Sequence, residues 1–340
     1  MKRWVRRIAA RKNAADSIRG RIVTQTALAT PPVDGVLLLD KPVGITSNAA
    51  IQRVKRLLRA AKAGHVGTLD PLASGLLPVC LGEATKFSAG ALGAAKSYDA
   101  EILLGVTTAT GDTEGEVTSR QAVAVTRDQV EAALRRFTGA IEQTPPMYSA
   151  LKRDGRPLYA YARAGLTVAR KPRSIIIHDI TLHHFAAQRC MIGVRCSKGT
   201  YIRVLAEDIG RALGCGATLA GLRRVAVGAF DLTRAVTLER LEALSAVRRS
   251  ECLLPVDSLV SVLPELLLEA DLVRRMVTGQ PGQVAGLATG WVRLYDQQRR
   301  FLGLGEVQSG GRLVPKRLVA VPAAAAAGDS GQPLQASKIA

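Results

Sequence analysis

The chain has 340 residues, which is enough for one large domain and a small one. It carries 47 Lys and Arg residues against 28 Asp and Glu residues, a formal net charge of +19. An enzyme that acts on small molecules needs no such excess of positive charge. The usual reason for an excess of this kind is contact between Lys or Arg side chains and phosphate groups. The composition therefore favours a nucleic-acid partner, with solubility alone as the alternative.

The cysteines, five in number, are scattered along the chain and form no Cys-x-x-Cys pair. This spacing argues against a disulfide framework and against a zinc ribbon, and it suits a reducing compartment. The sequence contains no apolar run that is long enough to span a bilayer. We therefore expect a cytoplasmic protein with no membrane partner.

Residues 1–30 hold eight basic residues and a single acid, Asp16. They lack the long apolar stretch of a secretory signal. The remaining interpretations are a disordered basic arm that contacts phosphates, a solvated tail and an organelle transit peptide. We expect the disordered arm, and we expect a disordered, low-complexity tail over residues 323–340.

The first ordered elements should be a strand and a helix. Residues 35–42 form an apolar run that ends at a proline, which predicts a buried strand. A helix should follow, capped by Thr46 or Ser47, with an apolar stripe facing the core. The exposed face of this helix would hold five bases and no acid. A face that is only solvated is usually stabilised by pairs of opposite charges, so this pattern favours an anionic partner. Those bases are Arg53, Lys55, Arg56, Arg59 and Lys62.

Residues 64–75, the aspartate loop below, contain three glycines, one proline and a single carboxylate, Asp70. One interpretation is structural, because an aspartate before Pro71 is a common turn residue. The other is chemical, because an ionised carboxylate can be a nucleophile toward carbon. Pairing with an arginine such as Arg203 would keep the carboxylate ionised. The glycines would allow a nucleic-acid partner to approach closely.

The middle of the chain alternates strands and helices. Residues 96–104 predict a strand that carries Tyr98, and Thr126 with Gln129 forms a capping-box pattern at the start of a helix. Tyr159 and Tyr161 lie among basic side chains. This pattern is typical of an exposed nucleotide-binding surface, and the alternative is a tyrosine-bearing helix packed on the core. Two strands of a hairpin and a helix that contains Arg203 should follow, at residues 174–185, 190–196 and 201–213.

From about residue 254 the pattern changes to a short helix and short strands with glycine turns. These features predict a small, mostly β module. The expected elements are a helix over residues 271–277 and strands over 291–295, 301–307 and 312–318. We therefore divide the chain into the basic arm 1–30, a catalytic domain 31–252, a small domain 253–322 and the tail 323–340.

Several motifs are absent from the sequence. It contains no P-loop, no dinucleotide-binding glycine pattern after a strand and no Gly-x-Ser-x-Gly elbow. His178, His183 and His184 lie near two cysteines, which leaves a metal site open beside the simpler interpretation of histidines on the polar face of a strand. Their spacing matches no known zinc pattern, so we predict no metal.

The aspartate loop resembles the signature loop of the tRNA pseudouridine synthase B family, and further motifs match that family in the right order. They are Asp40-Lys41-Pro42-x-Gly44-x-Thr46-Ser47, Lys96-x-Tyr98, Leu104-Gly105 with Thr108, Thr110, Asp112 and Gly115, Pro145-Pro146-x-Tyr148-Ser149-Ala150-x-Lys152, Leu158-Tyr159-x-Tyr161-Ala162-Arg163-x-Gly165, Cys196-Ser197-Lys198-Gly199-Thr200-Tyr201-Ile202-Arg203 and Leu222-Arg223-Arg224. The resemblance covers residues 33–230. The C-terminal module matches the family's small RNA-binding domain in place and size but less closely in sequence.

The resemblance implies an α+β pseudouridine synthase fold, with a mixed, mostly antiparallel sheet flanked by helices and a small mostly-β, PUA-like domain. It also implies an isomerase that converts uridine 55 in the T-loop of tRNA to pseudouridine, without metal or cofactor. The partner would be the T-arm stem-loop of tRNA, and we expect a monomer. Attack of the aspartate on ribose C1′, its attack on uracil C6 and a ribosyl elimination route remain open.

The resemblance also implies roles for individual residues. Asp70 would be the catalytic nucleophile, Tyr98 would stack on the uracil, and Arg203 would pair with Asp70. His65 would fill the space that the flipped nucleotide leaves, and Leu222 would form an apolar wall of the uracil pocket. The further substrate-binding residues would be Lys41, Lys198 and Tyr201. Two rivals remain: an RNA-binding protein without chemistry, and an aspartate-dependent phosphatase, which would want a second acid where the chain has Leu72.

Overall fold

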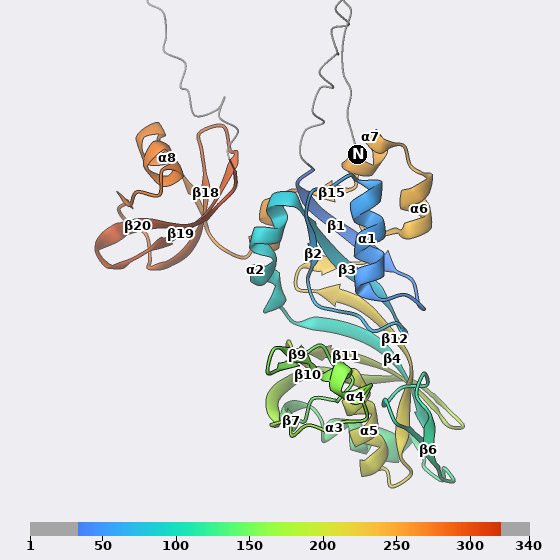
Figure 1. Cartoon of the computed structure of the whole chain (residues 1–340). Helices are drawn as coiled ribbons and strands as arrows, with labels where there is room; N and C mark the ends of the chain where they lie inside the picture. The colour runs from blue at the N-terminus through green and yellow to red at the C-terminus, as the bar shows by residue number, and fades with distance from the viewer. Residues whose placement is uncertain (1–32, 321–340) are drawn as a thin grey trace, which may run out of the picture. The chain divides into compact units, whose positions relative to one another are not determined.

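A computed structural model of the chain describes residues 33–320, so the predictions for residues 1–30 and 323–340 lie outside the described residues. Within the described part the largest sheet has eleven strands, and its main path runs β14-β1-β3-β12-β4-β11-β10-β7 (Figure 1). The strands are β1 (Gly35–Lys41), β2 (Ala63–His65), β3 (Ala73–Leu81), β4 (Lys96–Leu104), β7 (Gly139–Gln143), β10 (Arg173–Ala186), β11 (Arg189–Cys196), β12 (Ala217–Val227), β13 (Phe230–Asp231), β14 (Val236–Thr237) and β15 (Leu253–Leu254).

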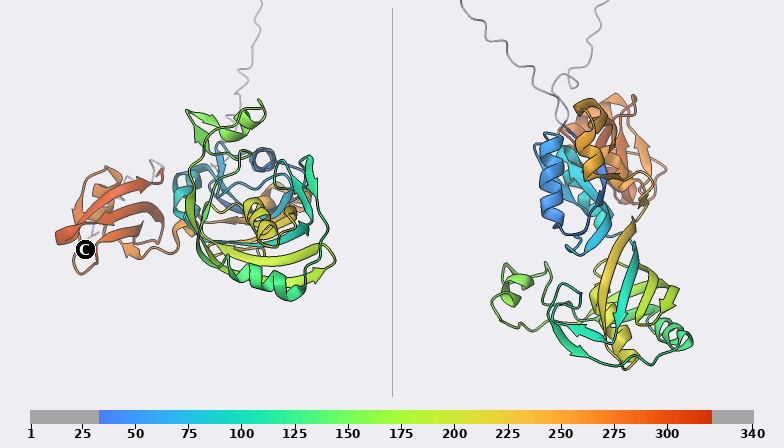
Figure 2. Two further views of the ribbon diagram at one scale, coloured as in Figure 1. Left: turned by 90° about the horizontal axis from the view of Figure 1, so that it is seen from below. Right: turned by 90° about the vertical axis from the view of Figure 1, so that its right-hand side faces the viewer.

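Most neighbouring strands in this sheet are antiparallel, and the exceptions are the parallel pairs β1–β14 and β12–β3. The sheet is therefore mixed and mostly antiparallel, which confirms the predicted fold class. β12 joins the two parts of the sheet, because it pairs with β3 through Leu222–Arg224 and with β4 along most of its length. Figure 2 shows β12 as the long yellow strand between the blue and the green strands.

Helices cover the sheet, and the longer ones contribute to one large core. Ala50, Ile51 and Val54 of the first helix share this core with Val130 of the third and Leu205 of the fifth. The described helices are α1 (Ser47–Leu57), α2 (Ser88–Leu92), α3 (Arg127–Arg135), α4 (Leu158–Ala162), α5 (Ile202–Ala212), α6 (Leu238–Ala243), α7 (Ala246–Glu251) and α8 (Ala270–Val277), with the short helical turns η1 (Gly82–Phe87), η2 (Val256–Val260) and η3 (Ser309–Gly311).

Strand β1 is buried on both faces. Leu37 and Leu39 pack into the core that α1 and α5 share, whereas Val36 and Leu38 pack into a second core with η1 and η2. Successive side chains point to opposite faces of a strand, so the part of β1 that is covered on both sides, Val36 to Leu39, is apolar at every position. This explains the continuous apolar run from which the strand was predicted.

A second sheet of five strands lies in the C-terminal part of the described chain, in the order β16-β18-β19-β20-β17. Its strands are β16 (Glu265–Leu267), β17 (Gly282–Gln283), β18 (Gly290–Tyr295), β19 (Phe301–Val307) and β20 (Arg312–Leu318). The mostly-β character predicted for this module is confirmed. β15 still pairs with β1, and the proposed division of the chain at residue 252 stays a prediction.

Two small hairpins complete the described fold, β5 (Val106–Thr108) with β6 (Val117–Arg120) and β8 (Lys152–Arg153) with β9 (Arg156–Pro157). The second hairpin leads into α4, where Leu158 is buried and Tyr159 is exposed. Arg156 and Arg163 lie over the rings of Tyr161 and Tyr159, respectively. One face of α4 therefore packs inward and an aromatic, basic face is exposed, and the binding of nucleotides by that face stays a prediction.

Candidate active site

The aspartate loop connects β2 to β3 and is held from beneath by the start of α1. The Ser47 hydroxyl donates a hydrogen bond to the Leu69 carbonyl and accepts one from the Leu69 N–H, both at 2.8 Å. The Gly44 N–H donates to the Pro71 carbonyl at 2.8 Å. These contacts fix the backbone on both sides of Asp70, so the position of the carboxylate is set by α1 and the turn before it.

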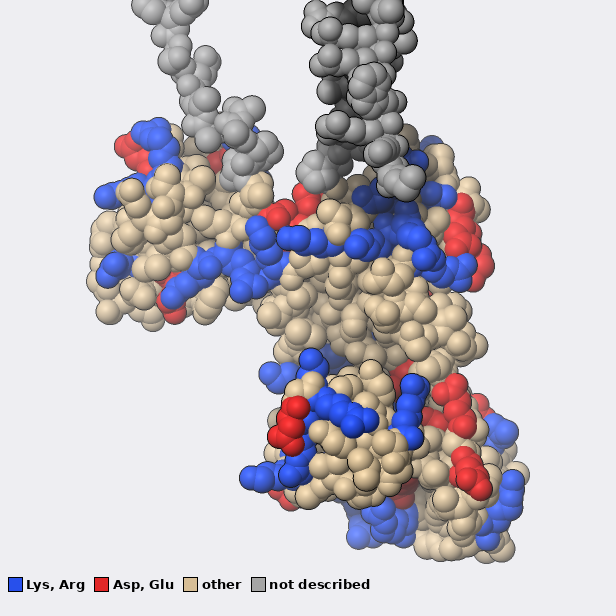
Figure 3. All heavy atoms as spheres, in the orientation of Figure 1, with Lys and Arg blue, Asp and Glu red and all other residues tan. Residues whose placement is uncertain are grey.

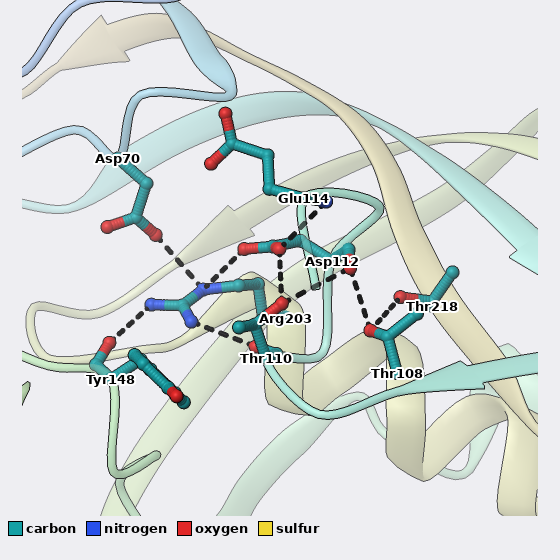
Figure 4. A network of polar contacts seen from close by, with 8 residues as sticks. All are labelled: Asp70, Thr108, Thr110, Asp112, Glu114, Tyr148, Arg203 and Thr218. Carbon is teal, nitrogen blue, oxygen red and sulfur yellow. Dashed lines mark hydrogen bonds and ion pairs between the residues drawn. The ribbon is translucent and has the colours of Figure 1, made fainter. Parts of the chain in front are cut away.

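The Asp70 carboxylate is directed at Arg203. Its Oδ2 atom lies 3.0 Å from Nε of the guanidinium, and the Asp70 side chain remains 43% exposed. Because the ion pair leaves part of the carboxylate accessible, Asp70 can meet a substrate from the open side. The predicted Asp70–Arg203 pair is therefore present (Figure 4).

Arg203 is nearly inaccessible and has little freedom to turn. It projects from the first turn of α5, and its two terminal nitrogens donate to backbone carbonyls: Nη1 to Thr110 at 2.9 Å and Nη2 to Tyr148 at 2.7 Å. Nε is thereby left for the carboxylates. The helix start is itself held by Gln143, whose side chain pairs with the backbone of Tyr201.

A second carboxylate, Asp112, lies on the other side of the same guanidinium. Its Oδ2 atom is 3.7 Å from Arg203 Nε, and its side chain is 6% exposed. Asp112 also accepts hydrogen bonds from the Thr110 hydroxyl at 2.5 Å and from the Glu114 N–H at 3.2 Å (Figure 4). Arg203 is thus placed between a buried carboxylate and an accessible one.

Glu114 adds a third carboxyl group to this edge of the site. Burial raises the pKa of the Glu114 carboxyl, and the negative charges of Asp112 and Asp70 act in the same direction. The sequence motif contained Asp112 and Glu114 lies in the same stretch, but neither was assigned a role. The available signal was the alternation of polar residues at 108, 110 and 112 before a glycine.

Lys41 lies at the end of β1 and is fully buried. Its ammonium group donates to the carbonyls of Pro42 and Ile45 at 2.7 and 2.8 Å. Burial lowers the pKa of Lys41 to about 8, although the Asp70 charge opposes this change. Since its hydrogen bonds go to its own turn, Lys41 shapes the backbone beside Asp70.

Tyr98 and Arg224 lie side by side on β4 and β12 and are both buried. Burial raises the pKa of the Tyr98 hydroxyl, and the positive charge of Arg224 opposes this change. The Arg224 guanidinium donates to three carbonyls of the aspartate loop and β3: Leu76 at 2.7 Å, Gly67 at 2.9 Å and Thr68 at 3.5 Å. Arg224 had been noticed only as part of a motif, and the structure shows that it ties the loop to β12.

The glycines of the aspartate loop have a packing role that we had not predicted. Gly75 has a φ of +98°, and a Cβ atom there would lie 2.3 Å from the Arg224 carbonyl. Gly67 has a φ of +77°, and its Cβ would lie 3.2 Å from the Arg224 guanidinium. The close approach of β12 therefore excludes a side chain at Gly75, and the positive φ favours glycine at both positions.

The other predicted residues lie around this centre at different depths. Leu222 on β12 is paired on one side with Ala73 of β3, which comes three residues after Asp70. On the other side it is paired with Ala100 of β4, which comes two residues after Tyr98. His65 ends β2, and burial lowers the pKa of its imidazole. Lys198 is exposed in the turn before α5, and within residues 33–320 no hydrogen bond or ion pair joins it to Asp70 or Arg203. The roles of these residues stay predictions.

Two further features bear on sequence predictions. His178, His183 and His184 lie on β10, and no cluster of three or more His, Cys, Asp or Glu side chains suited to a metal ion occurs within residues 33–320. No helix in the same part of the chain is long and apolar enough to cross a membrane.

Comparison with known proteins identifies three matching segments. Residues 55–202 match the TruB family pseudouridylate synthase N-terminal domain, residues 203–261 match the tRNA pseudouridylate synthase B C-terminal domain, and residues 264–319 match the pseudouridine synthase II TruB C-terminal domain. A chain in the crystal structure of a Cbf5-Nop10-Gar1 complex has a similar fold, with a TM-score of 0.63 and 27% identity over 82% of this chain and 80% of that one.

Curated relatives match over nearly their whole length. The tRNA pseudouridine synthase B of Methylobacillus flagellatus is 54% identical over 288 residues, covering 84% of this chain and 95% of that protein. The protein of the same name from Azoarcus sp. is 56% identical over 288 residues, covering 85% and 95%. With the matching segments extending from residue 55 to residue 319, the chain belongs to the TruB family of pseudouridylate synthases.

Proposed function

We propose that this protein isomerises uridine 55 in the T-loop of tRNA to pseudouridine, with Asp70 as the nucleophile. The observation that carries the proposal is the geometry of Asp70, a half-exposed carboxylate on a tightly held loop, 3.0 Å from a buried arginine. The names of the relatives, tRNA pseudouridine synthase B, support tRNA as the substrate. The proposed partner is the T-arm stem-loop, bound by a monomer.

The reaction exchanges one bond for another within a single nucleotide. The bond between uracil N1 and ribose C1′ breaks, the uracil turns, and a bond forms between uracil C5 and the same C1′. The proton on C5 is lost, N1 gains one, and the Asp70 carboxylate is released unchanged. Attack of Asp70 on C1′, its addition to uracil C6 and a ribosyl elimination each satisfy this balance.

The residues around Asp70 suit these demands. A base within a folded loop must leave its stack before a side chain can reach it. In our proposal the Tyr98 ring stacks on the extruded uracil and Leu222 forms an apolar wall beside that base. His65 fills the space that the flipped nucleotide leaves in the RNA. Lys198 and Tyr201 contact the substrate, and Arg203 keeps the carboxylate aimed at the reacting atom.

Mapping of pseudouridine on an unmodified tRNA transcript tests the proposal. Incubation with the wild-type protein should convert uridine 55 and leave the other uridines unchanged, and a transcript with cytidine at that position should gain no pseudouridine. Binding of the transcript without any conversion would support instead an RNA-binding protein without chemistry. Conversion at a different uridine would retain the reaction and refute the proposed position.

A further inference from the structure

A cluster of arginines surrounds a cavity at the far end of α1, outside the site described above. The cavity has a volume of about 350 Å³ and is lined by Arg53, Arg56, Leu57, Arg59, Glu242 and Arg249. Four guanidinium groups and a single carboxylate therefore meet around it. The lining residues from Arg53 to Leu57 follow Ser47, which holds the aspartate loop, so at 1.5 Å per residue the cavity lies about 9 to 15 Å along α1 from Ser47.

Arg249 organises the floor of this cavity. Its guanidinium donates to the carbonyls of Leu241 at 2.9 Å, Glu242 at 2.8 Å and Leu57 at 3.2 Å. The carbonyls at the end of a helix carry partial negative charge and would repel an anion. Because Arg249 satisfies carbonyls at the ends of both α1 and α6, it removes this obstacle and adds a positive charge of its own.

The remaining charges leave the cavity strongly positive. Arg53 is paired with Glu242, with its Nη2 atom 2.6 Å from the carboxylate. The side chains of Arg56 and Arg59 are exposed, and within residues 33–320 neither makes a hydrogen bond or an ion pair. Basic side chains gather over the face of the molecule that α1 provides (Figure 3).

The backbone of Arg59 is a second, independent observation. Arg59 has a φ of +52°, and it follows the last turn of α1, where the Arg59 N–H donates to the Arg56 carbonyl and the Ala60 N–H to the Lys55 carbonyl. Glycine or asparagine is favoured at such a position, and another residue there costs about 1 kcal/mol. The arginine is therefore unfavourable for the backbone, which points to a use for its charge.

We propose that this arginine pocket, formed by Arg53, Arg56, Arg59 and Arg249, binds a backbone phosphate of the RNA substrate, several nucleotides from the uridine that meets Asp70. The planar fork of an arginine matches the geometry of a phosphate. The cavity is open, and Arg56 and Arg59 have no partner among residues 33–320, which suits a phosphate that is part of a polymer. This inference rests on the proposed function only in taking tRNA as the polymer.

The test compares two double variants that remove the same charge. Arg56→Gln with Arg59→Gln changes the pocket, whereas Arg135→Gln with Arg136→Gln changes two exposed arginines at the end of α3. Binding of an unmodified tRNA transcript is measured from 50 to 200 mM salt. The pocket variant should bind about 10-fold more weakly, and the slope of log affinity against log salt should fall by about one to two. The α3 variant should stay within about 2-fold of the wild type.

A single variant separates binding from folding. Arg59→Asn should raise the melting temperature, because asparagine tolerates the left-handed backbone, and should still weaken tRNA binding. Equal salt slopes for the pocket and α3 variants would overturn the inference. If the wild type converts no uridine but the slopes differ, the proposed function fails and the phosphate site stands.

Discussion

At the scale of single residues, the site depends on one arginine whose donors point in different directions. Arg203 offers Nε to Asp70 and its two terminal nitrogens to the carbonyls of Thr110 and Tyr148. The two backbone contacts fix the plane of the guanidinium, and the plane fixes the direction in which Asp70 is held. The predicted pair with Asp70 is made through a single nitrogen, Nε.

Arg203→Lys should therefore lower kcat by about 100-fold, because one ammonium group cannot reach both carbonyls and the carboxylate. The assay is pseudouridine formation at saturating tRNA. Arg211→Lys on the same helix is the matched control, since Arg211 is exposed and, within the described residues 33–320, its one ion pair is with Asp208. Near-normal turnover of Arg203→Lys would refute the positioning role.

Lys41 gives the site a pH dependence that can be measured through stability. Its pKa falls from its ordinary value of 10.5 to about 8 in the folded protein. Between these two values the unfolded chain binds more protons than the folded one, so the contribution of Lys41 to the free energy of unfolding rises with pH. Below pH 8 the cost of burying the charged ammonium is present in full.

The free energy of unfolding of wild type minus that of Lys41→Met should therefore increase from pH 8 to pH 10.5 and stay level from pH 6 to pH 7. Denaturant titrations at each pH provide the measurement. Lys171→Met removes a lysine that is exposed in the structure and should show no such trend. A difference that is constant across the range would contradict the lowered pKa.

At the scale of elements, the start of α1 has two adjacent residues with separate tasks. Thr46 caps the helix by accepting a hydrogen bond from the Ala49 N–H at 3.1 Å. Ser47 uses its hydroxyl for the aspartate loop instead, with two bonds to the backbone of Leu69. The same turn thus stabilises a helix and positions the nucleophile.

Thr46→Ala and Ser47→Ala should each lower the free energy of unfolding by about 1 to 2 kcal/mol. Only Ser47→Ala should also lower kcat, by roughly 10-fold with little change in KM, because only it releases the backbone beside Asp70. Steady-state kinetics and denaturant unfolding of both variants decide the matter. An equal loss of kcat in the two variants would assign the effect to the helix as a whole.

Sequence reasoning succeeded where the determinants are local. The capping box of Thr126 and Gln129 and the strand over residues 96–104 were predicted from neighbouring residues and are present. Asp112 and Arg224 acquire their roles through contacts with residues about 90 and 150 positions away, so no local pattern could assign them. We had predicted that the glycines of the aspartate loop allow the nucleic-acid partner to approach. Glycine is instead required at position 75 by β12, a strand that comes much later in the chain.

At the scale of the whole molecule, the excess of positive charge is the property that reaches beyond the site. Residues 1–30 hold eight of the 47 basic residues and lie outside the described part of the chain. Contacts between basic side chains and phosphates release counterions, so each contact that is lost lowers the dependence of affinity on salt. The salt dependence of tRNA binding therefore reports how many of these charges take part.

Removal of residues 1–30 should weaken tRNA binding and reduce the slope of log affinity against log salt, while turnover at saturating tRNA stays unchanged. Filter binding between 50 and 200 mM salt gives both quantities. A chain in which the eight bases of the arm are replaced by glutamine is the matched control for length. An unchanged slope would show that the arm takes no part in binding.

The central claim is that Asp70 is the nucleophile, and the variant Asp70→Asn tests it most directly. Asparagine keeps the size of the side chain and removes its nucleophilic charge. Pseudouridine formation at uridine 55 is measured together with binding of the same unmodified tRNA. We predict that Asp70→Asn binds tRNA within about 3-fold of the wild type and forms pseudouridine at least about 10⁴-fold more slowly. Turnover close to the wild-type rate, with binding intact, would contradict the assignment.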